Sequence, residues 1–144
     1  MRRISVPIIV LAATSACGTL EPDHKRTERE ASYLSYAGSP ALLETPDTVI
    51  AGTPFFVRVR TYGGGCIDQG DTETAIEEHL IEIRPFDVFT THLPRGWACP
   101  DILALYTHTV SLRIAVSGTW TLRAIGRAGP GDNPESAERS IVVR

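Results

Sequence analysis

The stretch of residues 46–66 constrains the fold of this chain more than any other. It reads Pro-Asp-Thr-Val-Ile-Ala-Gly-Thr-Pro-Phe-Phe-Val-Arg-Val-Arg-Thr-Tyr-Gly-Gly-Gly-Cys. Within it, the side chains of residues 55–62 alternate. Phe55, Val57, Val59 and Thr61 share one face, and Phe56, Arg58, Arg60 and Tyr62 share the other. Strict alternation predicts a half-buried β-strand with one face in the core.

The run Gly63, Gly64 and Gly65 follows this strand directly. A glycine-rich loop can cradle a phosphate, but this run lacks the Lys-Ser/Thr ending and the following helix that such a loop uses. Three glycines let the backbone reverse sharply. The sequence therefore predicts a hairpin loop or bulge that delivers Cys66 to a covalent partner.

The first residues have the pattern of a secretory signal peptide. Arg2 and Arg3 precede a short apolar run that ends in small residues. The sequence Thr14-Ser15-Ala16-Cys17 resembles the lipobox of bacterial lipoproteins. That resemblance implies that residues 1–16 are removed and that Cys17 is acylated, which would anchor the protein to a membrane. Cleavage by ordinary signal peptidase after Ala16 is the alternative.

The resemblance also implies a location. In Gram-negative lipoproteins, aspartate after the acylated cysteine favours the inner membrane, whereas this chain has Gly18. The expected location is the cell envelope, at the periplasmic or outer face of the outer membrane.

Residues 17–40 are predicted to be a lipidated terminus and flexible tether. Most of this segment is charged or polar, and little in it could fill a core. Glu21, Lys25 and Arg29 have helical spacing, so a short solvated helix is the alternative. Pro22 and the missing apolar stripe favour the tether.

Residues 41–144 are predicted to form one all-β domain. Further short strands are expected at 40–44, 48–50, 75–89, 120–125 and 140–144, with a helical turn as the alternative at 75–80. Residues 102–107 and 109–116 are expected to form two more strands or one long bent strand. A polar loop is expected at 67–74, a long irregular connection at 87–101 and a Gly/Pro-rich loop at 126–136. Pro85 should split its stretch or mark a bulge, because proline donates no ladder hydrogen bond. These features favour an antiparallel two-sheet sandwich of about seven strands.

Two phrases carry a further resemblance. The phrase at 46–55 with Thr-Tyr-Gly-Gly-Gly-Cys, and the ending Gly-Thr-Trp-Thr-Leu-Arg-Ala-Ile-Gly with Arg-Ser-Ile-Val-Val, resemble uncharacterised bacterial lipoproteins with an immunoglobulin-like β-sandwich domain. The resemblance implies a fold and does not supply a function.

The chain has three cysteines. With Cys17 assigned to the lipid, Cys66 and Cys99 remain, and both fall in predicted loops of an exported domain. A disulfide between them is expected. No Cys-x-x-Cys spacing indicates a redox site.

Charge and motifs narrow the function further. The chain carries 14 Lys+Arg and 17 Asp+Glu, and losing Arg2 and Arg3 leaves 12 against 17, a formal charge of −5. This acidic balance disfavours nucleic acid and anionic lipid surfaces as partners. No Gly-x-Ser-x-Gly elbow exposes a serine, so no catalytic residue and no cofactor are assigned.

Two sets of side chains could hold a metal. Asp68, Asp71 and Glu73 could offer oxygen ligands to calcium, although their spacing misses the known loop pattern, and a solvated acidic loop is expected instead. His79, His92 and His108 could form a zinc or copper site if they met near Asp87 or Asp101. The leading hypothesis is a lipid-anchored, non-catalytic envelope module that binds a protein or surface polymer. The alternative is a periplasmic metal-binding protein using these three histidines.

Overall fold

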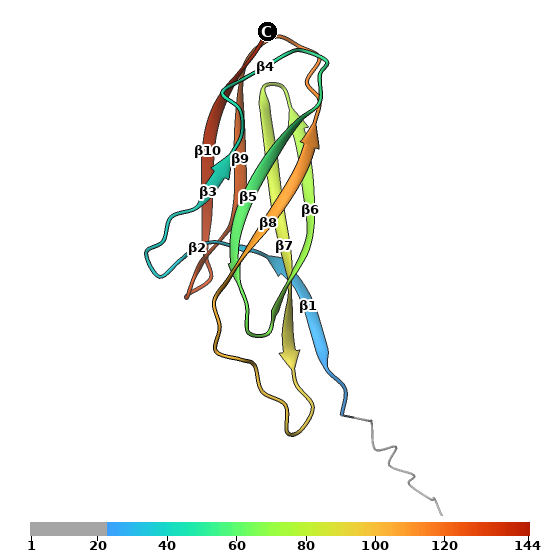
Figure 1. Cartoon of the computed structure of the whole chain (residues 1–144), viewed down its shortest axis with the longest axis vertical. Helices are drawn as coiled ribbons and strands as arrows, with labels where there is room; N and C mark the ends of the chain where they lie inside the picture. The colour runs from blue at the N-terminus through green and yellow to red at the C-terminus, as the bar shows by residue number, and fades with distance from the viewer. Residues whose placement is uncertain (1–22) are drawn as a thin grey trace, which may run out of the picture.

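The computed structural model describes residues 23–144, which fold as ten strands (Figure 1). The predicted signal peptide and Cys17 lie outside the described residues. The strands are β1 (Arg26–Ala31), β2 (Tyr33–Tyr36), β3 (Leu42–Glu44), β4 (Thr48–Val49), β5 (Phe55–Gly63), β6 (Ile67–Glu77), β7 (Leu80–His92), β8 (Ala104–Leu112), β9 (Gly118–Gly129) and β10 (Asn133–Val143).

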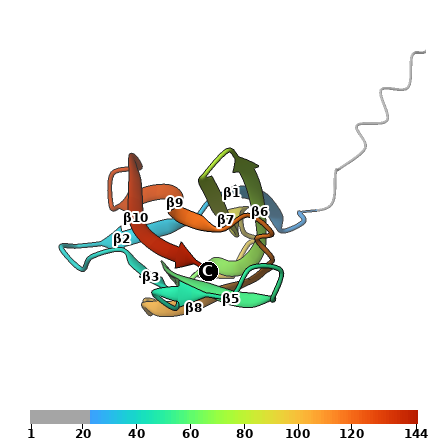
Figure 2. The same cartoon turned by 90° about the horizontal axis from the view of Figure 1, so that it is seen from above.

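All ten strands belong to one curled sheet of mixed direction. Seen from above, β3, β5 and β8 form one wall, and β10, β9, β7, β1 and β6 form the facing wall (Figure 2). Strand β2 connects the two walls, because it pairs with β9 in parallel and with β5 in antiparallel direction. Strands β7 and β9 also pair in parallel.

The all-β prediction is confirmed, but the predicted arrangement differs. The sandwich of two separate sheets with about seven strands is replaced by ten strands in one connected sheet. Two strands cause most of the difference. One is β2, which hydrogen-bonds to both walls, and the other is β6, where the sequence predicted a polar loop.

The central strand β5 lies where the alternation predicted it. Val57, Val59 and Thr61 are almost completely buried, and Phe55 is 8% exposed. They pack inside the curled sheet together with the other buried apolar side chains of the core. These are Leu34, Val49, Ile81, Ile83, Leu112, Ile114, Trp120, Leu122, Ala124, Ile141 and Val143.

The predicted tether is wrong for residues 26–36. Strand β1 pairs with the second half of β7, and β2 continues along β9. Between them Ser32 is fully buried, donates its N–H to Pro85 O and accepts a hydrogen bond from Arg127 N. Strand β1 has few apolar side chains because most of its residues face solvent, so its ladder hydrogen bonds hold it in place.

Two predicted loops are also corrected. Residues 67–74 belong to β6. The predicted loop 126–136 shrinks to the turn between β9 and β10, which pair from Gly118 with Val143 to Ala128 with Asn133. Pro85 does not split its stretch, because β7 is continuous. It does mark a bulge, as the other half of that prediction expected: a register shift in β6 between Gln69 and Thr72 lies opposite the stretch that contains Pro85.

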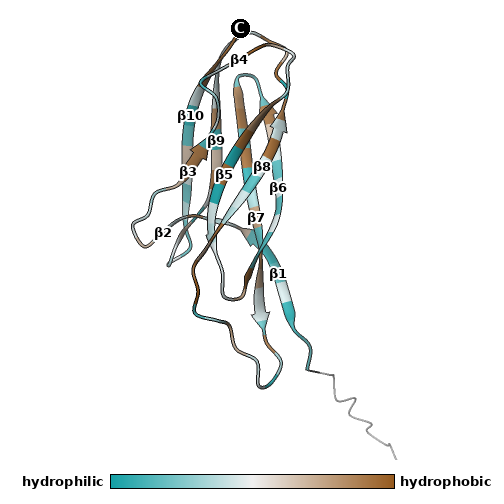
Figure 3. Ribbon diagram, in the orientation of Figure 1, coloured by the Kyte–Doolittle hydropathy of each residue, from teal (hydrophilic) through white to brown (hydrophobic). Residues whose placement is uncertain are grey.

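Hydropathy along the strands matches this packing, with brown and teal alternating on β5 and β7 (Figure 3). Among residues 23–144, no helix is long and apolar enough to cross a membrane.

Candidate functional site

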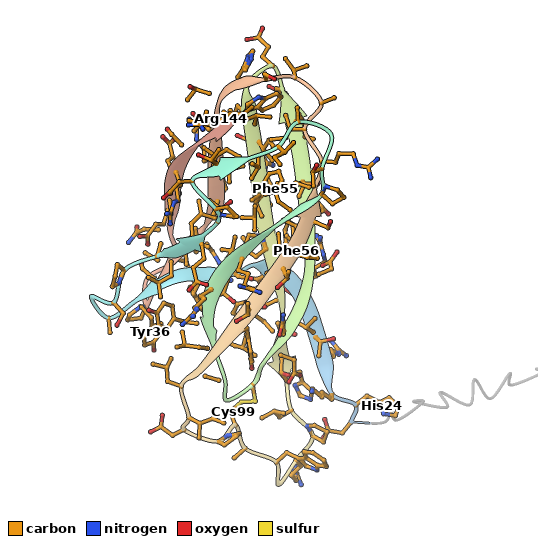
Figure 4. All side chains as sticks on the ribbon, turned by 45° about the horizontal axis from the view of Figure 1, so that its top comes forward. His24, Tyr36, Phe55, Phe56, Cys99 and Arg144 are labelled. Atoms are coloured by element: carbon orange, nitrogen blue, oxygen red, sulfur yellow. A yellow bond between two sulfur atoms is a disulfide. The ribbon has the colours of Figure 1, made fainter. Side chains whose placement is uncertain are left out.

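The two ends of the domain differ in how they are built (Figure 4). We call the end that carries Asp23, Cys66 and the 93–103 loop the entry end. The opposite end carries the 50–54 turn, the 113–117 turn and Arg144, and we call it the far end.

The disulfide fixes the entry end. Cys66 follows β5, and Cys99 lies in the 93–103 loop between β7 and β8. The two cysteines are bonded, with their α-carbons 5.1 Å apart. The bond holds the middle of this loop to the turn that begins β6. The loop is shorter than the predicted connection of residues 87–101, because β7 continues to His92.

Asp23 attaches the start of the described chain to the same loop. His92 Nε2 lies 2.7 Å from Asp23 Oδ1, and the backbone N–H of Arg95 donates to Asp23 Oδ2 at 2.7 Å. These two hydrogen bonds, the one from His92 first, lower the pKa of the Asp23 carboxyl. The chain therefore enters the domain against the loop that the disulfide fixes.

A chain of buried polar groups lies between β6, β7 and β8. Asp87 is completely buried, and His108 is 2% exposed. His108 Nε2 lies 3.1 Å from Asp87 Oδ1, and His108 Nδ1 lies 2.9 Å from Thr72 Oγ1. Asp87 also accepts hydrogen bonds from Thr61 Oγ1 and from the backbone N–H of Gly70.

The register shift in β6 explains why this chain of groups exists. It removes Gly70 from the ladder, and the Asp87 carboxylate accepts the N–H that the ladder no longer uses. Only glycine fits there, because a β-carbon on Gly70 would lie 2.5 Å from Phe86 O. A glycine inside a polar strand signals such a bulge, so Gly70 is the residue from which this bulge could have been predicted.

This series of buried polar side chains closes the curled sheet and is not accessible as a reaction centre. Strand β6 pairs with β7 and β8 pairs with β5, so β6 and β8 face each other across a seam. Side chains bridge the seam, including Thr72 to His108 and Gln69 Nε2 to Thr107 O at 2.9 Å. Thr72, His108 and Asp87 resemble a relay of catalytic groups. However, a histidine with its side chain 1% exposed offers no site for a substrate.

The structure does not bring the three predicted metal ligands together. His79 packs on Trp120, with ring centroids 4.9 Å apart, at the opposite end of β7 from His92. His108 does meet Asp87, as the metal hypothesis required, but without a second histidine. Within residues 23–144, no three His, Cys, Asp or Glu side chains are grouped as a metal site needs. Asp101 is exposed in the loop before β8.

The acidic side chains of β6 are paired with basic side chains of β1 and its approach. Arg29 contacts Asp71 at 2.7 Å and Glu73 at 2.6 Å, and its guanidinium lies 3.4 Å from the centre of the Phe86 ring. Lys25 lies 3.7 Å from Asp68. These carboxylates therefore balance the charge of β1, and the geometry does not assemble them around calcium.

A shallow groove opens near the far end. It is lined by Glu44, Pro46, Phe56, Arg58 and their neighbours on β3 and β5. The alternation of β5 turns Phe56 outward, where it is 59% exposed. Ile50 and Val116 are also exposed in the adjoining turns. The sequence placed Phe56 on the outer face of β5 but did not identify it as a candidate binding residue.

Comparison with known proteins adds no relationship. No protein-family model, curated protein or solved structure matches this chain.

Proposed function

We propose that the protein is a non-catalytic module of the cell envelope, anchored by lipid on Cys17, that binds a protein or a surface polymer. One observation carries the binding part. Phe56 is a large apolar side chain that β5 holds outward in a groove, at the end of the domain opposite to Asp23. Large exposed aromatic side chains beside charged ones are typical of recognition surfaces.

The chemistry of the groove suits a partner with mixed polarity. Arg58 and Glu44 lie on neighbouring strands in paired register beside Phe56, and Glu44 forms an ion pair with Arg60 at 2.8 Å. An aromatic ring can pack on an apolar side chain or on the face of a sugar ring, and the charged groups then set the orientation. The disulfide between Cys66 and Cys99 supports export, as in the lipoprotein group that the sequence resembles.

Photo-crosslinking in intact envelopes tests the binding surface. A photoreactive phenylalanine in place of Phe56 should form a covalent adduct with the partner. Mass spectrometry identifies the partner if it is a protein. If the partner is a polymer, the added mass resists protease. Ile76 on β6 is the matched control, because it is 55% exposed but lies on the other wall. Equal labelling at both positions, or none at Phe56, would contradict the proposed surface.

The anchor is tested separately at Cys17. The Cys17→Ala variant should accumulate as an uncleaved precursor without lipid, because the lipoprotein peptidase acts on the acylated cysteine. The mass of the wild-type mature N-terminus should show the acyl chains. Normal processing of the variant would rule out this type of anchor.

A further inference from the structure

We propose that the 93–103 loop and the start of β8 form a membrane-contacting surface that places apolar side chains in the interfacial layer of the bilayer that holds the anchor. This inference rests on the proposed lipid at Cys17. It adds a second, non-covalent contact and so sets which end of the domain faces the lipid.

The distance between the anchor and the domain is short. Asp23 lies six residues after Cys17. Even a fully extended chain of that length spans only about 20 Å. Strand β7 alone, with 13 residues, is about 43 Å long. A lipid at Cys17 therefore keeps the entry end near the bilayer, because the tether reaches only about half the length of the domain.

The structure attaches this entry point directly to the loop. Asp23 accepts hydrogen bonds from the loop backbone at Arg95 and contacts His92. The disulfide from Cys66 to Cys99 holds the same loop to the sheet. The loop and the point where the chain leaves toward Cys17 are thus one surface, already ordered before any contact with lipid.

The side chains on this surface suit the bilayer interface. Trp97 is 70% exposed, and Ile102 and Leu103 are each 61% exposed. Leu105, at the start of β8, is 54% exposed. Tryptophan is enriched at the level of the lipid headgroups, and neighbouring aliphatic side chains add apolar area that the acyl boundary can bury.

Polar groups frame the apolar ones, as they do in interfacial surfaces. Lys25 and Asp68 form an ion pair beside Cys66 and Trp97, around a small groove. A surface with this border can lie in the headgroup layer but not in the hydrocarbon core. A lipid surface, contacted at interfacial depth, is therefore the occupant of this surface.

The test uses full-length acylated protein in vesicles of phosphatidylethanolamine and phosphatidylcholine, which carry no net charge, with and without brominated acyl chains that quench nearby tryptophan. The chain has two tryptophans, and Trp120 is buried against His79. The Trp97→Phe variant therefore isolates the signal of Trp120. A double variant, Trp97→Phe with Phe56→Trp, is the matched control, since it moves the exposed tryptophan to the groove near the far end.

In wild-type protein, Trp97 emission should shift to shorter wavelength on the vesicles and should be largely lost with brominated lipid. Emission from Trp120, measured in the Trp97→Phe variant, should not be quenched. Emission from the tryptophan introduced at position 56 in the double variant should not be quenched either. Three results would overturn the inference. The first is Trp97 emission that is not quenched in protein that floats with the vesicles. The second is a shift of Trp97 emission without quenching, because that combination indicates that a protein surface, such as a second copy, covers Trp97. The third is equal quenching of wild-type protein and the double variant. A mature N-terminus without acyl chains would overturn the anchor and this inference together, so the two failures are distinguishable.

Discussion

At the scale of single residues, Asp87 is a completely buried acidic side chain whose polar partners come from three strands. Its buried carboxylate accepts hydrogen bonds from Thr61 and Gly70 and contacts His108. Asp87→Ala would leave these groups buried without an acceptor. Its free energy of unfolding should fall by at least about 2 kcal/mol, because each unsatisfied buried group costs roughly 1 to 3 kcal/mol.

Urea unfolding measures this loss. Asp87→Asn is the matched control, because its amide keeps one acceptor oxygen and the shape of the side chain. It should lose less stability than Asp87→Ala. If the two variants lose the same amount, or if Asp87→Ala is as stable as the wild type, the buried hydrogen bonds do not hold the seam.

The ion pair of Asp71 with Arg29 predicts a dependence of stability on pH. The hydrogen bond from Arg29 is the main cause that lowers the pKa of the Asp71 carboxyl below its ordinary value of 3.8. Because the folded pKa is below the unfolded one, the pair contributes stability above the unfolded pKa and loses it as pH falls through the folded pKa. Wild type should therefore be more stable than Asp71→Asn at pH 6.

Thermal unfolding at several pH values measures this difference. The advantage of the wild type should shrink below about pH 4 and vanish below both pKa values of the carboxyl. The side chains lie at the surface, so added salt should also reduce the advantage. A difference between the two proteins that is constant from pH 6 to pH 2 would contradict the ion pair as its cause.

At the scale of elements, β2 determines how the sheet curls, and Leu34 is the buried side chain that holds it in the core. Leu34→Ala should lower the free energy of unfolding by about 2 to 5 kcal/mol, because it removes packed methyl groups and leaves a cavity. Leu42→Ala on β3 is the control and should cost less, since Leu42 is 36% exposed. Similar losses in both variants would show that β2 is not packed as described.

The same element shows what the sequence could predict. Alternation identified β5 because its two faces meet different surroundings, apolar inside and solvent outside. It missed β1 and β6 because their side chains mostly face solvent on both faces. These two segments are strands because they form ladder hydrogen bonds with β7, and that pairing depends on residues far away in the sequence.

The candidate sites follow the same physical rule. The cysteine pair was predictable because only two cysteines remained once Cys17 was assigned. The meeting of His108 with Asp87 depends on the pairing of β5 with β8 and on the bulge in β6. Such a contact cannot be predicted from local pattern or spacing. The sequence therefore identified His108 and Asp87 as candidates but did not predict that they meet.

At the scale of the whole molecule, the disulfide links the entry end to a core that folds through its own burial. In the chain-entropy model, a bond between cysteines 33 residues apart stabilises the native state by about 3 to 4 kcal/mol. The apolar side chains of β5, β7 and β9 pack against one another in the core and should stay buried without it. Reduction should therefore lower the melting temperature while the β-rich circular dichroism spectrum survives.

The 93–103 loop should respond to reduction more than the sheet does. Hydrogen exchange should accelerate in the loop, where few backbone groups are paired, and change little in β5 and β9. The double variant Cys66→Ser with Cys99→Ser is the control, since reductant should leave its melting temperature unchanged. Loss of the β spectrum on reduction would mean that the bond holds the fold itself. Unchanged exchange in the loop would mean that Asp23 alone fixes the entry end.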